Sequence, residues 1–195
     1  MSLRYKGARL SATPPTTSTA SAPGLWTLPQ QFQAQSSNTW PPSVYPISRS
    51  LRFNSADSAY LGRTPASAGN RNIYTYSVWC KRSTLGTAQI LFDANVSNTS
   101  NPRDTWNFTA NDEIDVGFNI SGGSWVDAIT VPLYRDLGAW YHVVVAIDTT
   151  QATAANRVKI YVNNVLQTMT GGSTYPSQNA NTTINSANPH SIGRY

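Results

Sequence analysis

The feature that most constrains the fold is a run of β-branched and aromatic residues near the C-terminal end of the chain. Residues 140–147 form an almost unbroken apolar stretch that is shorter than an ordinary helix. Residues 158–162 alternate between apolar and polar, as expected for a strand with one buried face. Asn163 and Asn164 follow, and asparagine tolerates the left-handed backbone of a two-residue hairpin. The sequence therefore predicts an antiparallel β framework.

Further strands are predicted along the chain, separated by clusters of Asn, Gly and Ser. Residues 50–54 and 59–63 are expected to pair as a first hairpin. The next strand, 74–81, should place Tyr74, Tyr76, Val78 and Cys80 on one face and Thr75, Ser77, Trp79 and Lys81 on the other. The remaining candidates are 89–93, 105–109, 113–120 and 128–133. The pattern indicates an all-β antiparallel sandwich with an extended N-terminal arm.

The order of these segments also resembles a known family. Trp140-Tyr-His-Val, a polar loop and Val158-Lys-Ile-Tyr-Val-Asn-Asn-Val are similar to the laminin-G-like members of the concanavalin A-type jelly rolls, although Asn164 stands where the family usually has glycine. The resemblance implies a jelly-roll sandwich over residues 47–195. Such domains continue beyond the strand that resembles 190–193. We therefore expect that the natural chain continues past Tyr195, or else that the arm or a neighbouring subunit supplies the last strand.

Residues 1–46 differ from the rest of the chain. The stretch 11–24 is rich in Pro, Ser and Thr, and its prolines exclude a helix and an interior strand. A short helix is predicted near Thr27, with Pro29 in its first turn. The arm also holds the basic and large apolar residues Arg4, Lys6, Arg9, Leu25, Trp26, Leu28, Phe32 and Trp40. The arm either folds back on its own sandwich or becomes ordered on a partner, and we favour the docking arm.

The arm resembles the N-terminal segment of structural proteins of tailed bacteriophages, particularly marine ones. The resemblance rests on Ser11-Ala-Thr-Pro-Pro, Pro23-Gly-Leu-Trp-Thr-Leu-x-Gln and Asn38-Thr-Trp-Pro. It implies a virion protein made in the host cytoplasm, whose arm binds other virion proteins. Repeated display on a particle implies a homo-oligomer, for which a trimer is one arrangement. A tail fibre, a tail hub and the capsid exterior all remain open as locations.

Composition excludes several other functions. The net charge of +5 comes from 14 basic and 9 acidic residues without strong clustering, which argues against a nucleic-acid partner. The sequence has no apolar run of 18 residues and no signal-peptide core, so membrane insertion is not expected. Cys80 is the only cysteine, so no intramolecular disulfide can form.

One acidic segment raises the question of catalysis. The superfamily that the sequence resembles includes retaining glucanases, whose catalytic strand carries a Glu-Ile-Asp motif. Glu113 and Asp115 match the first two acidic places of that motif. Gly117 or Phe118 stands where the acid/base glutamate should be, whereas retention needs two carboxyls roughly 5 Å apart. We expect a strand with Ile114, Val116 and Phe118 in the core, no catalytic residue and no enzyme activity. A concanavalin-fold glycoside hydrolase or its inactive relative is the alternative.

Cofactor sites are not predicted. His142 and His190 have no nucleophile or further ligand at a recognisable spacing, which argues against zinc and against a histidine base. Laminin-G-like domains often carry calcium, so a structural calcium ion is the alternative to no cofactor. Its loop candidates are Asp93, Asn95, Asp104 and Asp112.

Aromatic side chains are the remaining functional candidates. If they are exposed, five aromatic residues could stack on sugar rings: Trp79, Trp106, Trp125, Tyr134 and Tyr175. Of these, Trp125, Tyr134 and Tyr175 are the candidate glycan-binding residues. In the alternative that we favour, Trp79 and Trp106 belong to the core and only Trp125 is free. The sandwich is therefore expected to bind host-surface glycan or a neighbouring subunit.

Overall fold

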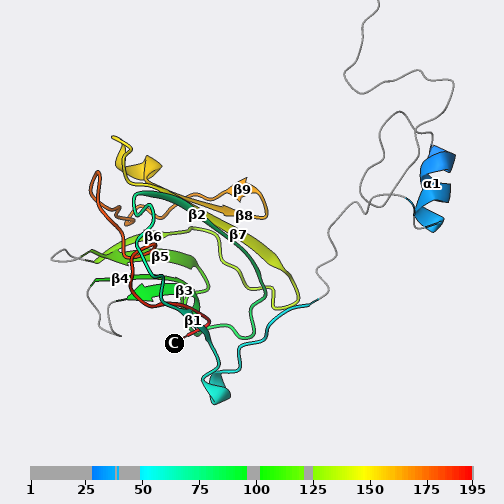
Figure 1. Cartoon of the computed structure of the whole chain (residues 1–195), viewed down its shortest axis with the longest axis horizontal. Helices are drawn as coiled ribbons and strands as arrows, with labels where there is room; N and C mark the ends of the chain where they lie inside the picture. The colour runs from blue at the N-terminus through cyan, green and yellow to red at the C-terminus, as the bar shows by residue number, and fades with distance from the viewer. Residues whose placement is uncertain (1–27, 38, 40–48, 96–101, 121–124, 195) are drawn as a thin grey trace, which may run out of the picture. The chain divides into compact units, whose positions relative to one another are not determined.

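A computed structural model of the chain describes residues 28–37, 39, 49–95, 102–120 and 125–194. Over residues 53–194 it shows two antiparallel sheets packed face to face, which confirms the predicted all-β sandwich (Figure 1). The six-stranded sheet has the order β1-β10-β3-β4-β5-β6, and the four-stranded sheet has the order β2-β7-β8-β9.

The strands of the six-stranded sheet are β1 (Leu61–Arg63), β10 (His190–Ile192), β3 (Gln89–Asn95), β4 (Arg103–Phe108), β5 (Ile114–Asn119) and β6 (Trp125–Ile129). Those of the four-stranded sheet are β2 (Ile73–Cys80), β7 (Tyr141–Asp148), β8 (Val158–Val162) and β9 (Val165–Leu166). Two short 3-10 helices are η1 (Ser55–Asp57) and η2 (Ala154–Asn156). Each predicted strand from 74 onward overlaps an observed strand, although the predicted strand 128–133 shares only residues 128 and 129 with β6.

The core lies between the two sheets and follows the period-two pattern of the strands. The run that opened the sequence analysis is β7, and its residues alternate between buried and half-buried. Val143 and Val145 of β7 belong to the same buried cluster as Trp106 and Phe118 of the opposite sheet. Ile114, Val116 and Phe118 are fully buried, as predicted for that strand. Burial of these side chains provides most of the driving force for packing the two sheets.

The hairpin between β8 and β9 forms as predicted. Asn163 and Asn164 have φ values of 49° and 67°, which is the left-handed conformation that a two-residue turn requires. The predicted first hairpin, in contrast, is wrong. Residues 51–54 are not a strand, and β1 pairs with β10 from the far end of the chain. The sequence identified residues 59–63 as a strand but carried no information about the partner of that strand.

The N-terminal part of the chain contains the short helix α1 (Leu28–Ser36), which confirms the predicted helix with Pro29 in its first turn. The chain divides into two compact units, residues 1–52 and 53–195. Of the predicted docking residues, Phe32 is 76% exposed on α1. Those at positions 4, 6, 9, 25, 26 and 40 lie outside the described residues, as does the side chain at position 28. No helix in the described part is long and apolar enough to cross a membrane.

A long irregular segment between β9 and β10 is held to the sandwich by buried polar groups. The Asp104 carboxylate on β4 faces inward and accepts hydrogen bonds from the backbone N–H groups of Thr183 and Ile184, at 2.6 and 2.8 Å. Asp104 and Thr182 are both fully buried. Desolvation by burial is the main cause that raises the pKa of Asp104 to about 7. The aspartate therefore fixes this segment against the end of the sandwich.

Candidate functional site

The outer face of the six-stranded sheet carries rows of small and polar side chains that cross neighbouring strands. One row runs in register through Gly62, Ser191, Asp93, Thr105, Gly117 and Asp127. The adjacent rows hold Asn95, Arg103, Asn119 and Trp125, and then Asn107 and Asp115. We call the side chains of these three rows the polar face. Successive residues point to opposite sides of a strand, so the same strands supply both this face and the core.

Asp93 organises the middle of the polar face. Its carboxylate accepts hydrogen bonds from the Asn95 amide at 2.6 Å, from Arg103 Nε at 2.6 Å and from the Thr105 hydroxyl at 3.0 Å. Arg103 also forms an ion pair with Asp93. Because Asp93 is 2% exposed and has several donors, its charge is already compensated within the protein.

Two further carboxyl groups lie at the β5–β6 side of the polar face. Asp127 pairs in register with Gly117, and Asp115 lies two residues from Gly117 on the same face. Desolvation by burial, followed by repulsion from Asp127 and Glu113, raises the pKa of Asp115 to about 7. Desolvation also raises the pKa of Asp127. Among the described residues, neither Oδ1 atom of Asp115 or Asp127 has a hydrogen-bond partner. Near neutral pH the Asp115 carboxyl is therefore present in both its protonated and its ionised form.

Trp125 lies over Gly117, which leaves room for its ring, and beside Asp127. A Cβ atom added to Gly117 would overlap the Trp125 indole and would come within 2.9 Å of Asp127 Oδ1. The Trp125 side chain also donates a hydrogen bond to Asp127, and this bond partly opposes the rise in the aspartate's pKa. Trp125 is 40% exposed, which confirms its predicted exposure, and its ring is an apolar surface next to polar groups.

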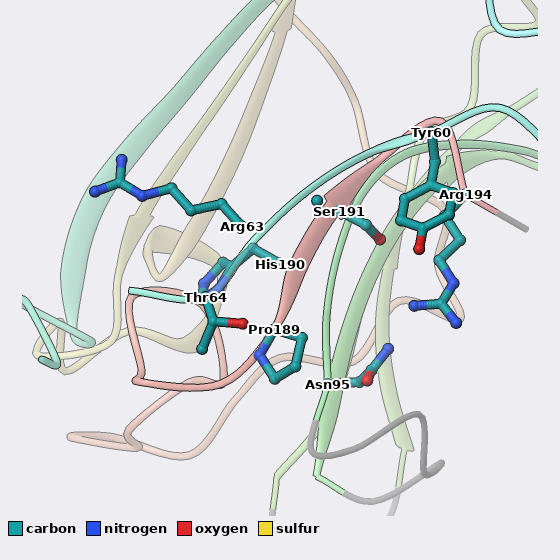
Figure 2. Close-up of a pocket in the computed structure, with 9 residues that line it drawn as sticks. Tyr60, Arg63, Thr64, Asn95, Pro189, His190, Ser191 and Arg194 are labelled. Atoms are coloured by element: carbon teal, nitrogen blue, oxygen red, sulfur yellow. The ribbon is translucent and has the colours of Figure 1, made fainter. Parts of the chain in front are cut away.

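A polar pocket of about 470 Å³ lies at the other end of the face, where β10 pairs with β1 (Figure 2). Its lining residues are Tyr60, Gly62, Arg63, Thr64, Asn95, Pro189, His190, Ser191 and Arg194. The guanidinium carbon of Arg194 lies 5.1 Å from the centre of the Tyr60 ring. Figure 2 shows Arg63 extending away from Arg194, so the two cations do not converge. A second pocket, of about 480 Å³, involves the same two strands together with Phe92.

The other predicted aromatic residues do not join this site. Tyr134 is 6% exposed and packs edge-on against Phe108 and Tyr141, so its ring cannot stack on a sugar. Tyr175 is half-buried and packs against the core. Trp106 is a core residue, as expected.

Trp79 is a correction to the sequence analysis. It was assigned to the core, but its side chain is 52% exposed on the outer face of the four-stranded sheet. Its ring stacks on His142 of β7, with the ring centroids 4.8 Å apart. The predicted face of β2 was right, because Trp79 alternates with the inward-facing Val78 and Cys80. A strand pattern gives the face, but Trp is apolar enough to be mistaken for a core residue wherever it lies.

The structure does not gather the acidic candidates into one catalytic or metal site. Glu113 precedes β5 and accepts a hydrogen bond from the Thr109 hydroxyl at 3.2 Å. Of the four calcium candidates, Asp93 and Asn95 bond to each other, whereas Asp104 faces the interior and Asp112 pairs with arginines. Across the described ranges, no three His, Cys, Asp or Glu residues are grouped so that they could hold a metal ion.

Sequence reasoning missed several members of the polar face. Asp127, Thr105 and Ser191 were passed over because each occurs singly within an ordinary strand pattern. Their proximity depends on strand order, which brings residues from positions 62 to 191 into one row. The alternation of Thr105, Asn107 and Asp115 with core residues was the only signal in the sequence, and it indicates an exposed side without indicating its neighbours.

Comparisons with known proteins bear on the fold. Among solved structures, the chain is similar to a native heptameric SAP-like pentraxin from Limulus polyphemus, with 18% identity and a TM-score of 0.43 over 69% of this chain and 57% of that chain. It is also similar to the Ruminococcus gnavus IT-sialidase CBM40 bound to alpha2,3 sialyllactose, with 10% identity and a TM-score of 0.42 over 68% of this chain and 78% of that chain. The chain thus spans just over half the length of the pentraxin.

A search of curated proteins found no match. The family match is extensive, because residues 53–195 fit the laminin-G-type family described as the concanavalin A-like lectin/glucanases superfamily. This range contains both sheets and the complete polar face. The chain therefore belongs to the concanavalin A-like lectin/glucanases superfamily.

Proposed function

We propose that the polar face binds a glycan without cleaving it. The observation that carries the proposal is the placement of the exposed Trp125 ring over Gly117 and beside Asp127, with Asp115 two residues further along the same face of β5. Sugar rings have apolar faces and polar edges, so a binding site for them combines an aromatic surface with hydrogen-bonding groups. The family match adds support, since the superfamily is named for lectins as well as glucanases.

The two carboxyl groups suit hydroxyl ligands for an electrostatic reason. Burial, followed by repulsion from Asp127 and Glu113, raises the pKa of Asp115 to about 7, so near neutral pH its carboxyl can either donate or accept a hydrogen bond. A sugar hydroxyl can do both at once. A sugar hydroxyl that reaches the Oδ1 atoms of Asp115 and Asp127 would supply the hydrogen-bond partner that they lack among the described residues.

Replacing Trp125 by alanine is expected to weaken glycan binding by about tenfold or more, because it removes the aromatic surface of the site. The measurement is titration calorimetry with the oligosaccharide that gives the strongest signal on a glycan array. Gly117→Ala should also weaken binding, since its methyl group would displace the indole.

Trp140→Ala is the matched control. Trp140 is also an exposed tryptophan, at 48%, but it precedes β7 in the other sheet and lies outside the polar face. Its replacement should leave the dissociation constant within about twofold. Equal loss in the Trp125 and Trp140 variants, or a blank array, would contradict the proposal.

Glycoside hydrolysis is the second candidate, and one observation favours it. The carboxyl that is missing from strand β5 has a substitute in Asp127 on β6, which repels Asp115 and helps to raise its pKa. A proton-donating acid with a raised pKa beside a second carboxyl is the pair that glycoside hydrolysis requires. Turnover on a polysaccharide panel that disappears in both Asp115→Asn and Asp127→Asn would establish this function in place of binding alone.

We further propose that the protein is a tailed-phage virion component, attached through residues 1–46 and displaying the sandwich for host-surface glycan or a neighbouring subunit. The support is the resemblance of the arm, the change in composition near residue 46, and the exposed Phe32 on α1. A large apolar side chain in a short exposed helix gains stability when it enters a partner surface. Other virion proteins are the proposed partners, and copies of the chain are proposed to form a homo-oligomer on the particle.

Deleting residues 1–46 is expected to remove the protein from particles while the sandwich stays folded, because the two sheets form within residues 53–195. Incorporation is measured by quantifying the protein in purified virions, and folding by the thermal transition of the truncated chain. Phe32→Ala in the full chain is a smaller change that should reduce incorporation in the same direction. Loss of the thermal transition on deletion would show that the arm is part of the folded core instead.

A further inference from the structure

We infer that the pocket between β1 and β10 binds the anionic group of an acidic sugar, a carboxylate or a sulfate. The pocket lies at the end of the polar face opposite to Trp125, and its lining residues have no catalytic or metal role in the site described above. The inference deepens the proposed glycan binding and rests on it for the sugar part of the ligand. It adds a charge requirement that Trp125 and the two aspartates do not impose.

The cation of the pocket is Arg194, which a turn holds in place. Gly193 has a φ of 74°, and a Cβ atom there would overlap the Phe53 ring, so the turn requires glycine. This turn follows β10 and leads into Arg194, whose guanidinium lies over Tyr60. Tyr60 in turn lies across Gly62, where an added Cβ would approach its ring to 3.2 Å. A guanidinium stacked on an aromatic ring keeps its edge N–H groups free for a carboxylate or a sulfate.

The second observation is an unsatisfied hydroxyl in the pocket wall. Ser191 is 5% exposed, and its Oγ has no hydrogen-bond partner among the described residues. Figure 2 shows this hydroxyl on the side of β10 that faces Tyr60 and Arg194. A buried hydroxyl without a partner is unfavourable in the unbound protein, so a ligand oxygen that accepts from it gains that hydrogen bond.

The charges around the pocket favour an anion. Its lining includes Arg63 and Arg194 but no aspartate or glutamate. The adjacent carboxylate in the row, Asp93, is bonded to Arg103, Asn95 and Thr105 and so does not neutralise Arg194. The Thr64 and Ser191 hydroxyls also line the pocket, whereas the Asn95 amide already donates to Asp93. The two hydroxyls provide hydrogen-bond donors near the Arg194 cation.

The pocket and Trp125 belong to the same face of one sheet. Five steps between neighbouring strands separate β1 from β6, which corresponds to roughly 24 Å. The row between them, through Asp93, Thr105 and Gly117, is polar or small throughout. An oligosaccharide lying across the strands would place neutral units near Trp125 and an acidic unit at Arg194.

The test uses the full chain and three sugars that share one ring: D-galacturonate, D-galactose 6-sulfate and neutral D-galactose. Each is titrated while the backbone amide resonances of Gly62 and Ser191 are followed by NMR. We expect one or both anionic sugars to bind at least tenfold more tightly than galactose. The anionic sugar that shifts these amide resonances at the lower concentration shows whether the pocket prefers a carboxylate or a sulfate.

Arg194→Gln should remove this preference, and Ser191→Ala should weaken anion binding several-fold. Lys159→Gln is the charge-matched control, because Lys159 lies on the four-stranded sheet and its loss changes the net charge equally. Equal binding of all three sugars, or an unchanged preference in Arg194→Gln, would overturn the inference.

The outcomes also separate this inference from the proposed function. If Trp125-dependent glycan binding is present without anion selectivity, only the anion-binding role of the pocket is wrong. If the amides respond to anionic sugars while Trp125→Ala has no effect on any glycan, the pocket stands and the proposed role of Trp125 fails.

Discussion

Replacing Asp104 by alanine is expected to cost roughly 2–6 kcal/mol of folding stability, because two buried backbone N–H groups lose their common acceptor. The donors are Thr183 and Ile184, and both bond to the same carboxylate oxygen at 2.6–2.8 Å. Asp104 is 0% exposed, so water cannot replace the lost acceptor without entering the sandwich. The measurement is urea denaturation at pH 5, where Asp104 is neutral in the folded protein. At that pH the alanine variant gains nothing from removing a buried charge, so the free energy of unfolding reports the lost hydrogen bonds.

Asp104→Asn separates the charge from the hydrogen bonds. The folded-state pKa of about 7 lies above the ordinary value of aspartate, so the folded chain holds an extra proton between about pH 4 and 7. Wild-type stability, relative to the Asn variant, should therefore rise as the pH falls from 8 to 4, by at most on the order of 4 kcal/mol. Asp115 acts in the same direction, and His190, whose pKa burial lowers, acts in the opposite one. Both are present in each protein and cancel in the comparison.

The exposed Asp57 serves as a control for Asp104. Asp57→Asn should change neither the stability nor its pH dependence by more than about 0.5 kcal/mol. If wild type and Asp104→Asn show the same change in stability between pH 4 and 8, the carboxyl does not titrate in this range in the folded chain.

Asp112→Ala is the second large effect, with an expected fall in melting temperature of about 10 °C or more. Arg82 has a fully buried side chain that pairs with Asp112 at 2.8 Å and lies 4.8 Å above the Phe108 ring. Removing the aspartate leaves that guanidinium buried without its counter-charge. The Gly86 backbone N–H, followed by Arg135 and Arg82, lowers the pKa of Asp112 to about 2 against the opposing effect of burial. The pair therefore persists well into acid.

Arg135→Ala tests the same carboxylate from its exposed side. Arg135 bonds to Asp112 at 3.0 Å, but its side chain is 61% exposed and solvent screens the interaction. The variant should melt within about 3 °C of wild type. Similar losses in Asp112→Ala and Arg135→Ala would show that the buried arginine is not the source of the stability. Differential scanning calorimetry on both variants and wild type decides between these results.

Much of the fold could be predicted because strands have a local signature. The runs that became β7 and β8 contain β-branched residues in period two, and the inward positions Val143, Val145 and Ile160 are all buried. The Asn163-Asn164 turn has its own local signature, since few other residues adopt positive φ twice in succession. Short-range pattern was also sufficient for α1, where Pro29 occupies the first turn.

The candidate site could be predicted only in part. Trp125 was identified as an exposed aromatic residue, but Tyr134 was misassigned, because an aromatic residue in a polar loop segment looks the same whether its ring points outward or into the core. Asp112 was predicted as a candidate calcium ligand. In the structure its carboxylate accepts a hydrogen bond from the buried Arg82, which lies thirty positions earlier in the sequence. The second carboxyl beside Asp115 was missed because Asp127 lies on the next strand of the sheet.

The sequence by itself determined that this chain forms antiparallel strands, which side of each strand is apolar, and that a compositionally different arm precedes the sandwich. These properties depend on residues within one turn or one pleat of each other. The tertiary structure alone decided that β1 pairs with β10 and that one polar row joins Gly62 to Asp127. Strand order is set by the packing of the whole core and by the loop connections. It therefore brings together residues whose local sequence patterns do not indicate that they are neighbours.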